Sequence, residues 1–186
     1  MKRTFVTICL AAGIMLIQSC GNSDNKEDSV DSTRTQNENK PTVEKNASDF
    51  MTKATSGGIL EVQLGQMAQQ RAINQRVKDF GLMMIRDHTQ GNEELKALAA
   101  QKGITVPSTL SDDHQKHVDE LAKQNGNDFD KAYMDLMQSD HKEDIKEYTD
   151  ASEKVDDATI KGFAKKTVPM LQMHLDSVKA IKESLK

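Results

Sequence analysis

The sequence of 186 residues is poor in aromatic residues, proline and cysteine: it has no tryptophan, two tyrosines, five phenylalanines, three prolines and two cysteines. Strands favour aromatic and β-branched residues, so an aromatic content of 4% favours a helical fold over a β-sandwich. Two cysteines allow at most one disulfide, which excludes a disulfide-stapled scaffold. The sequence also lacks a Gly-x-Ser-x-Gly elbow, a phosphate-binding glycine loop and a His-Glu-x-x-His zinc motif. These absences favour a non-enzymatic protein.

An excess of positive charge is missing as well. The net charge at pH 7 is −4, with 25 basic and 29 acidic residues. Nucleic-acid binders present basic patches to phosphate groups. We therefore expect no nucleic-acid partner.

The chain has a long apolar run only at its N-terminus. Lys2 and Arg3 precede an apolar stretch from Phe5 to Ile17, which is followed by Ser19 and Cys20. This is the layout of a secretory signal peptide, and the stretch is shorter than the ~20 residues that a membrane span needs. Because an aliphatic residue at −3, a small residue at −1 and cysteine at +1 resemble the bacterial lipobox, residues 1–19 are predicted to be a lipoprotein signal peptide.

Cys20 is then the lipidated first residue of the mature chain. Loss of Cys9 with the signal leaves Cys20 without a disulfide partner, which lipidation explains. The lipid would anchor the protein to a membrane of the bacterial cell envelope. Gly21, rather than aspartate, at the next position favours the outer membrane by resemblance to the enterobacterial sorting rule.

Residues 20–46 contain two large apolar side chains after the cysteine, Val30 and Val43. Such a segment buries too little apolar surface to offset its ordering entropy. We predict that residues 20–46 are a lipidated cysteine and a disordered tether, and that residues 47–186 form the folded domain.

From Ala47 onward, apolar residues recur at helical spacing. Long helices are predicted from Ala47 to about Ala72 and from about Val77 to Gly103. A short helix is expected over about Ser111–Gln124, and two more long helices over about Asp128–Lys154 and from Ala158 onward. Four long helices in two hairpins, joined by a crossover that contains a short helix, predict an all-α, ferritin-like four-helix bundle.

Four polar residues, Glu61, His88, His141 and His174, interrupt the apolar stripes, one on each long helix. Residues equidistant from the turn of an antiparallel hairpin face each other. The midpoint of Glu61 and His88 falls in the first turn, and that of His141 and His174 falls in the second. Each pair should therefore lie at one height, whereas the relative height of the two pairs is not determined.

Unpaired polar groups in a core are costly, so these side chains should contact one another. One interpretation is a structural Glu–His hydrogen-bond cluster. The alternative is a site for a transition metal such as zinc, iron or copper, which imidazole and carboxylate ligands suit. A carboxylate-bridged di-iron centre is not expected, because Ile85, Gln138 and Leu171 occupy the positions three before the histidines.

The order and spacing of several further residues resemble a known family of exported bacterial proteins, the domain of unknown function 4142. The residues that carry the resemblance are Phe50, Gly57-Gly58, Glu61-Val62, the run 77–80, Asp87-His88, Phe129-Asp130, Tyr133, His141, Pro169 and His174. The resemblance covers about residues 47–184 and implies a ferritin-like bundle in the envelope. It implies no reaction, so three roles stay open: a non-enzymatic envelope module with a core Glu–His cluster, a metal-binding or metal-dependent redox protein, and a helical interaction module. The sequence indicates no particular protein partner.

Overall fold

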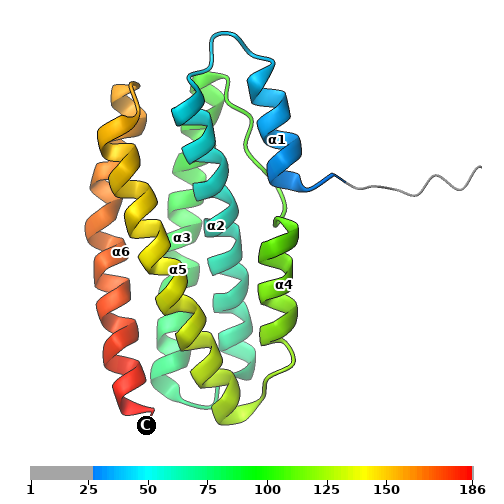
Figure 1. The fold of residues 1–186 in the computed structure, drawn as a ribbon. Helices are drawn as coiled ribbons and strands as arrows, with labels where there is room; N and C mark the ends of the chain where they lie inside the picture. The colour runs from blue at the N-terminus through cyan, green and yellow to red at the C-terminus, as the bar shows by residue number, and fades with distance from the viewer. Residues whose placement is uncertain (1–26, 186) are drawn as a thin grey trace, which may run out of the picture.

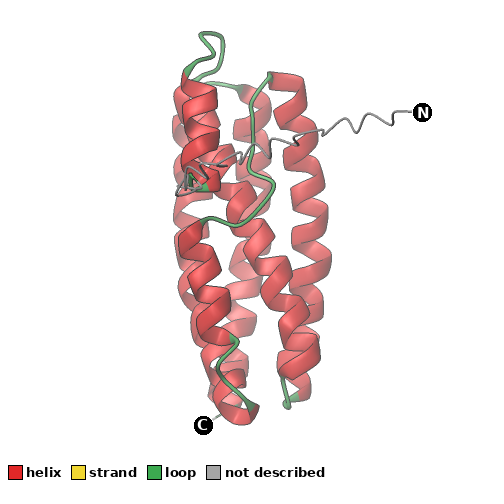
Figure 2. Cartoon of the chain, turned by 90° about the vertical axis from the view of Figure 1, so that its right-hand side faces the viewer, coloured by secondary structure: helices red, strands yellow, loops and turns green. Residues whose placement is uncertain are grey.

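The computed structural model describes residues 27–185, which fold into six helices and contain no strand. The helices are α1 (Ser29–Glu38), α2 (Lys45–Arg71), α3 (Gln75–Lys102), α4 (Asp112–Leu121), α5 (Gly126–Lys154) and α6 (Ala158–Ser184). The four long helices lie side by side, and α1 and α4 follow one another along the outer side of α2 (Figures 1 and 2). The all-α prediction is therefore confirmed.

Local sequence signals place the helix ends close to the predicted positions. The side chain of Asn74 caps α3 by accepting from the Arg76 N–H, and Ser111 and Asp157 cap α4 and α6 in the same way. Gly103 ends α3 with a φ of 66°, which glycine adopts without steric cost. Helices α2 and α3 form one hairpin, and α5 and α6 form the other.

Glycines allow close contact between α2 and α3. A Cβ atom on Gly65 would lie 2.7 Å from the backbone oxygen of Gly81, and one on Gly81 would lie 2.9 Å from the Cβ atom of Ala68. Any larger residue would push the two backbones apart. Gly65 therefore serves close helix packing rather than marking a break in the helix.

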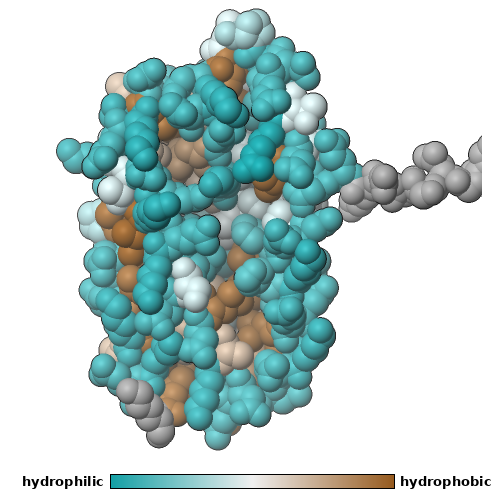
Figure 3. All heavy atoms as spheres, viewed as in Figure 1, coloured by the Kyte–Doolittle hydropathy of each residue, from teal (hydrophilic) through white to brown (hydrophobic). Residues whose placement is uncertain are grey.

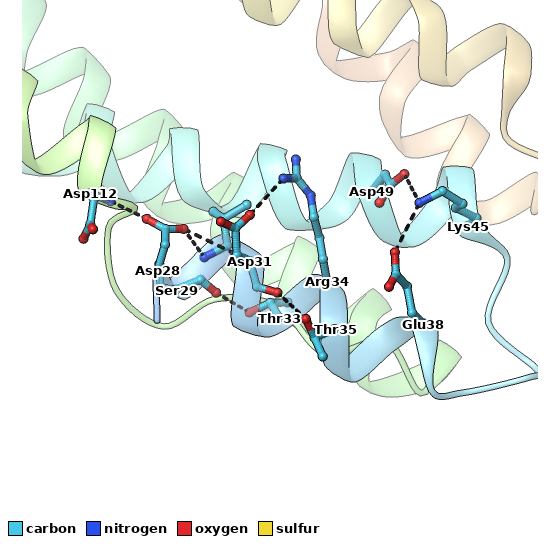
Figure 4. A network of polar contacts seen from close by, with 11 residues as sticks. Asp28, Ser29, Asp31, Thr33, Arg34, Thr35, Glu38, Lys45, Asp49 and Asp112 are labelled. Atoms are coloured by element: carbon cyan, nitrogen blue, oxygen red, sulfur yellow. Dashed lines mark hydrogen bonds and ion pairs between the residues drawn. The ribbon is translucent and has the colours of Figure 1, made fainter. Parts of the chain in front are cut away.

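The prediction of a disordered tether over residues 20–46 is wrong for its C-terminal part. Asp28 caps α1 by accepting from the Val30 and Asp31 N–H groups, and Figure 4 shows this end of α1 beside α4. The Asn37 amide donates to the Thr105 carbonyl at 2.9 Å and accepts from the Thr105 N–H at 2.8 Å. The segment thus docks through polar side chains and capping, which a hydrophobicity argument does not detect.

The predicted signal peptide, residues 1–19, and Cys20 lie outside the described residues. Within the described part of the chain, none of the helices combines the length and apolarity required to cross a bilayer. Hydrophilic residues cover most of the face that Figure 3 shows.

The interior contains two separate hydrophobic clusters. The first, towards the α1 end of the long helices, includes Phe50, Met51, Leu95, Tyr148, Phe163 and Leu171. The second, towards the opposite end, includes Leu64, Phe80, Met84, Phe129, Tyr133 and Val178. On each long helix, the polar residue singled out by the sequence lies at or near the change from one cluster to the other.

Candidate metal centre

The four predicted residues meet in the polar layer between the two hydrophobic clusters. Glu61 lies on α2, His88 on α3, His141 on α5 and His174 on α6, and the exposed fraction of each residue is between 0% and 7%. Their side chains form one cluster rather than two separate pairs. The expectation that each pair shares a height is confirmed, and the two pairs also share a height with each other.

The three imidazole rings face one another. Their centroids lie 5.7 Å apart for His88 and His141, 5.4 Å for His88 and His174, and 5.3 Å for His141 and His174. One ring nitrogen from each histidine lies within 4.8 Å of the corresponding nitrogens of the other two. Three nitrogen ligands could therefore bind one ion after small movements.

Each imidazole also has a partner outside this triangle. The contacts are His88 Nδ1 with Glu61 Oε2 at 2.6 Å, His141 Nδ1 with the Met137 carbonyl at 3.0 Å, and His174 Nε2 with Asp87 Oδ2 at 3.0 Å. Metal-binding histidines commonly make such contacts through the ring nitrogen that does not bind the metal. The contacts fix the orientation of each ring.

The protonation of the imidazoles follows from their burial. Burial lowers the pKa of His88 and of His174 to about 4, and burial together with the other two histidines lowers that of His141 to about 3. At neutral pH each ring is therefore neutral and carries one N–H. Neutral imidazole is the form that binds metal ions.

The outer partners determine which nitrogen carries that hydrogen. Burial alone would raise the pKa of Asp87, but hydrogen bonds from Arg86 and His174 outweigh it, and the pKa lies below its usual value. The ionised carboxylate and the Met137 carbonyl only accept hydrogen bonds, so His174 donates from Nε2 and His141 donates from Nδ1. His141 Nε2 and His174 Nδ1, 3.2 Å apart, then face each other with two lone pairs. A cation between them would relieve this repulsion.

Three carboxyl groups adjoin the imidazoles on the α2–α5 side. Burial raises the pKa of Glu61 and of Asp144 well above the usual values, and raises that of Asp140 to about 7. Because burial keeps His88 neutral, the short Glu61–His88 contact is a carboxyl–imidazole hydrogen bond that holds one proton rather than a full ion pair. The carboxyl groups therefore add little net negative charge while no cation is bound.

Several buried polar atoms in this layer have no hydrogen-bond partner. They are Glu61 Oε1, His88 Nε2, Tyr133 Oη and Asp140 Oδ2. Each such atom typically costs about 1–3 kcal/mol. His88 Nε2, together with the facing nitrogens of His141 and His174, is the nitrogen donor set that a metal ion requires.

Sequence reasoning missed Asp87 and Asp140. Each precedes a site histidine by one residue, and the ~100° step between neighbours on an ideal helix predicts that both point away from the site. Asp87 instead contacts His174 on α6, and a carboxylate oxygen of Asp140 lies within 4.8 Å of Glu61 and His141 ligand atoms. The repeated Asp-His pair at 87–88 and 140–141 was the signal that could have found them.

His114 and His117 in α4 lie among polar residues of the sequence, a pattern that predicts solvated side chains. His117 is exposed, as expected. His114 is half-buried, and its Nδ1 lies 2.9 Å from Ser56 Oγ, so the prediction is wrong for this residue. It lines a surface cavity.

Solved structures with a similar fold have low sequence identity to this chain. A DUF305 fragment from Deinococcus radiodurans superposes with a TM-score of 0.67 at 12% identity, covering 77% of this chain and 99% of that one. CopM in the Cu(II)-bound form superposes with a TM-score of 0.65 at 16% identity, covering 75% and 97%. At these identities the similarity concerns the fold alone.

Sequence comparison is more specific about the family. No curated protein matches the sequence. The profile of the family described as "Domain of unknown function (DUF4142)" matches residues 32–181, which include α2 to α5 and most of α1 and α6. The chain therefore belongs to the DUF4142 family.

Proposed function

We propose that this protein binds a transition-metal ion through His88, His141 and His174. The observation that carries the proposal is the contact of His141 Nε2 with His174 Nδ1 at 3.2 Å between two buried rings, whose outer partners assign a lone pair to each of these nitrogens. A hydrogen bond between these atoms would require a protonated ring, which burial disfavours. A metal ion satisfies both atoms without that proton.

In this proposal Glu61, the Met137 carbonyl and Asp87 orient the three imidazoles. Glu61 adjoins two of the imidazoles, with Oε2 2.6 Å from His88 Nδ1 and Oε1 3.5 Å from His141 Nδ1, and is the candidate fourth ligand. Three imidazoles with a carboxylate suit copper, zinc or iron. The Cu(II)-bound state of the structurally similar CopM supports copper as the first ion to test.

The proposed role is metal binding without catalysis. Burial of all three imidazoles supports it, since an organic substrate would have no direct access to the ion. The arrangement of the long helices supports assignment to the ferritin-like class, but the di-iron ligand pattern of that class does not occur on the described helices.

The decisive experiment measures metal content. The full chain is purified without a histidine tag or chelator, supplied with copper, zinc, iron and manganese salts, and examined by mass spectrometry. We expect one transition-metal ion per chain, which His141→Ala and His174→Ala lose and the exposed control His117→Ala retains. A wild-type protein that binds no ion, or single variants that keep it, would refute the proposal.

We also propose that Cys20 carries the lipid that anchors this domain to the bacterial envelope, with the outer membrane favoured by Gly21. The lipobox-like residues before Cys20 support this assignment. Cys20→Ser should release the protein from membranes and abolish incorporation of a labelled fatty acid. Retention of the variant on membranes would contradict the anchor.

A further inference from the structure

A polar cavity of about 520 Å³ opens on the surface between α1, α2, α4 and α5. Its outer part is lined by exposed side chains such as Asp31, Asp112 and Glu143, and its wall includes Ser56 and Gly57 of α2. Helix α1 forms one rim, and Asp28 holds this rim against α4 by accepting from the Asp112 N–H (Figure 4). The folded N-terminal segment therefore helps to shape the cavity.

The cavity is strongly acidic. Eight Asp and Glu side chains line it, six of them outside the half-buried pair Asp140 and Asp144, whose pKa values burial raises, against three cationic side chains and one histidine, His114. Walls with one dominant sign of charge concentrate counter-ions and raise their association rate. The occupants that this charge favours are cations.

The inner end of the cavity reaches the metal centre's carboxyl groups. Asp140 and Asp144 line the cavity and are partly exposed, whereas Glu61 behind them is 1% exposed. A Glu61 oxygen lies within 4.8 Å of an Asp140 oxygen, and the same carboxyl group contacts His88 Nδ1 at 2.6 Å. Carboxyl oxygens thus lead from the surface to the imidazoles.

Two oxygens along this line lack hydrogen-bond partners although they are buried. They are Asp140 Oδ2 and Glu61 Oε1. The cavity wall beside Asp144 is a glycine: a Cβ atom on Gly57 would lie 3.6 Å from Asp144 Oδ1. An ion that arrives from the cavity therefore meets the carboxyl groups of Asp140 and Asp144 first, and Glu61 lies behind them.

We propose that this acidic cavity is the entrance through which divalent cations reach the histidine cluster, and that Asp140, Asp144 and Glu61 pass the ion from oxygen to nitrogen ligands. This inference rests on the proposed metal-binding function. The exposed carboxylates act on the rate of loading rather than on the final affinity, because they lie outside the ligand set. Asp140 and Asp144 influence both the rate of loading and the final affinity.

The test uses the full chain and Cu²⁺ added as its chloride salt in a stopped-flow instrument. Loading is followed by tyrosine fluorescence, since the chain has no tryptophan and Tyr133 lies beside the site's carboxyl groups. We expect the double variant Asp112→Asn/Glu143→Gln to load about 3–10-fold more slowly at low ionic strength and to reach the wild-type stoichiometry. At 0.5 M NaCl the difference should shrink, because salt screens exposed charges.

The matched control is Glu93→Gln/Glu183→Gln. It removes the same charge from exposed sites on α3 and α6 that do not line the cavity, and it should load at the wild-type rate. If the wild type binds one ion but the Asp112/Glu143 variant loads as fast as the control, the entrance lies elsewhere. If the wild type binds no ion, the proposed function fails, and this inference fails with it.

Discussion

Replacing Asp140 by asparagine should stabilise the metal-free protein at alkaline pH. Asp140 Oδ2 is buried without a hydrogen-bond partner, and burial, with the nearby Glu143 and Glu147, raises the pKa of the carboxyl group to about 7. In the unfolded chain the pKa is close to 3.8. Above pH 7 the carboxyl group is therefore ionised in both states. Its charge is less favourable in the folded state, which lowers the free energy of unfolding.

The size of the effect follows from these two pKa values. At 1.36 kcal/mol for each pH unit, the difference between 3.8 and about 7 corresponds to a penalty of about 4 kcal/mol. Asp140 keeps some exposure, and solvent screening reduces this figure, so we expect Asp140→Asn to gain about 1–3 kcal/mol. For a domain of this size, that is an increase in Tm of about 3–10 °C.

The sign of the pH dependence is fixed by the raised pKa. The destabilising contribution of Asp140 should shrink as the pH falls from about 7 to about 4, because the folded state takes up this proton first. The buried imidazoles act in the opposite direction in both proteins, so the quantity to compare is the difference between wild type and variant at each pH. The advantage of the variant should therefore be largest at pH 8 and absent near pH 4. Thermal unfolding of both proteins with EDTA, followed by circular dichroism at the two pH values, measures it.

Bound metal supplies a further check. A cation beside the carboxylate relieves the penalty, so saturation with metal should narrow the difference between wild type and Asp140→Asn. Glu93→Gln, an exposed change of the same charge, should shift Tm by less than about 2 °C. A variant that is less stable than wild type at pH 8, or a difference that does not vary with pH, would refute the reasoning.

Four further predictions concern the metal centre and the packing. Asp87→Asn should weaken metal binding about 10–100-fold without abolishing it, measured by competition with a chelator, because the amide is a poorer acceptor for the His174 N–H. Metal retention should persist to about pH 5, checked by dialysis across a pH series, since the imidazole pKa values lie near 3–4; release already at pH 6.5 would contradict the assigned burial. Gly65→Ala should destabilise the protein by about 1–3 kcal/mol in urea, because its Cβ atom would meet an α3 carbonyl, whereas Gly91→Ala, with no atom within 4 Å, should be neutral or stabilising. Asn37→Ala should cost about 1–3 kcal/mol and speed amide exchange in α1; unchanged exchange would show that this side chain does not hold the helix in place.

Much of the candidate site could be predicted from the sequence because helical periodicity is strict. One polar residue in each of four apolar stripes was enough to place Glu61, His88, His141 and His174 in the interior. Equal distances from the turns then paired them correctly. The relative height of the hairpins depends on side-chain packing across their interface, such as the contact of His141 with His174, and no local signal encodes it.

The outer partners were harder to predict because they depend on neighbouring helices. Asp87 points away from its own helix's buried stripe, but α6 passes on that side and brings His174 to it. The same limit applies to α1. Its contacts, such as Asn37 with Thr105, are polar and join residues 68 positions apart, so a measure of apolar content could not reveal them.

The polar layer between the two hydrophobic clusters also determines how the long helices can slide past one another. A shift of one helix by a single turn, about 5.4 Å, would move its imidazole or carboxyl group among leucine, methionine and phenylalanine side chains and leave the other three groups incomplete. Uniformly apolar interfaces tolerate such sliding more readily. The cluster therefore selects one alignment of the four helices out of several with similar apolar burial, whether or not an ion is present.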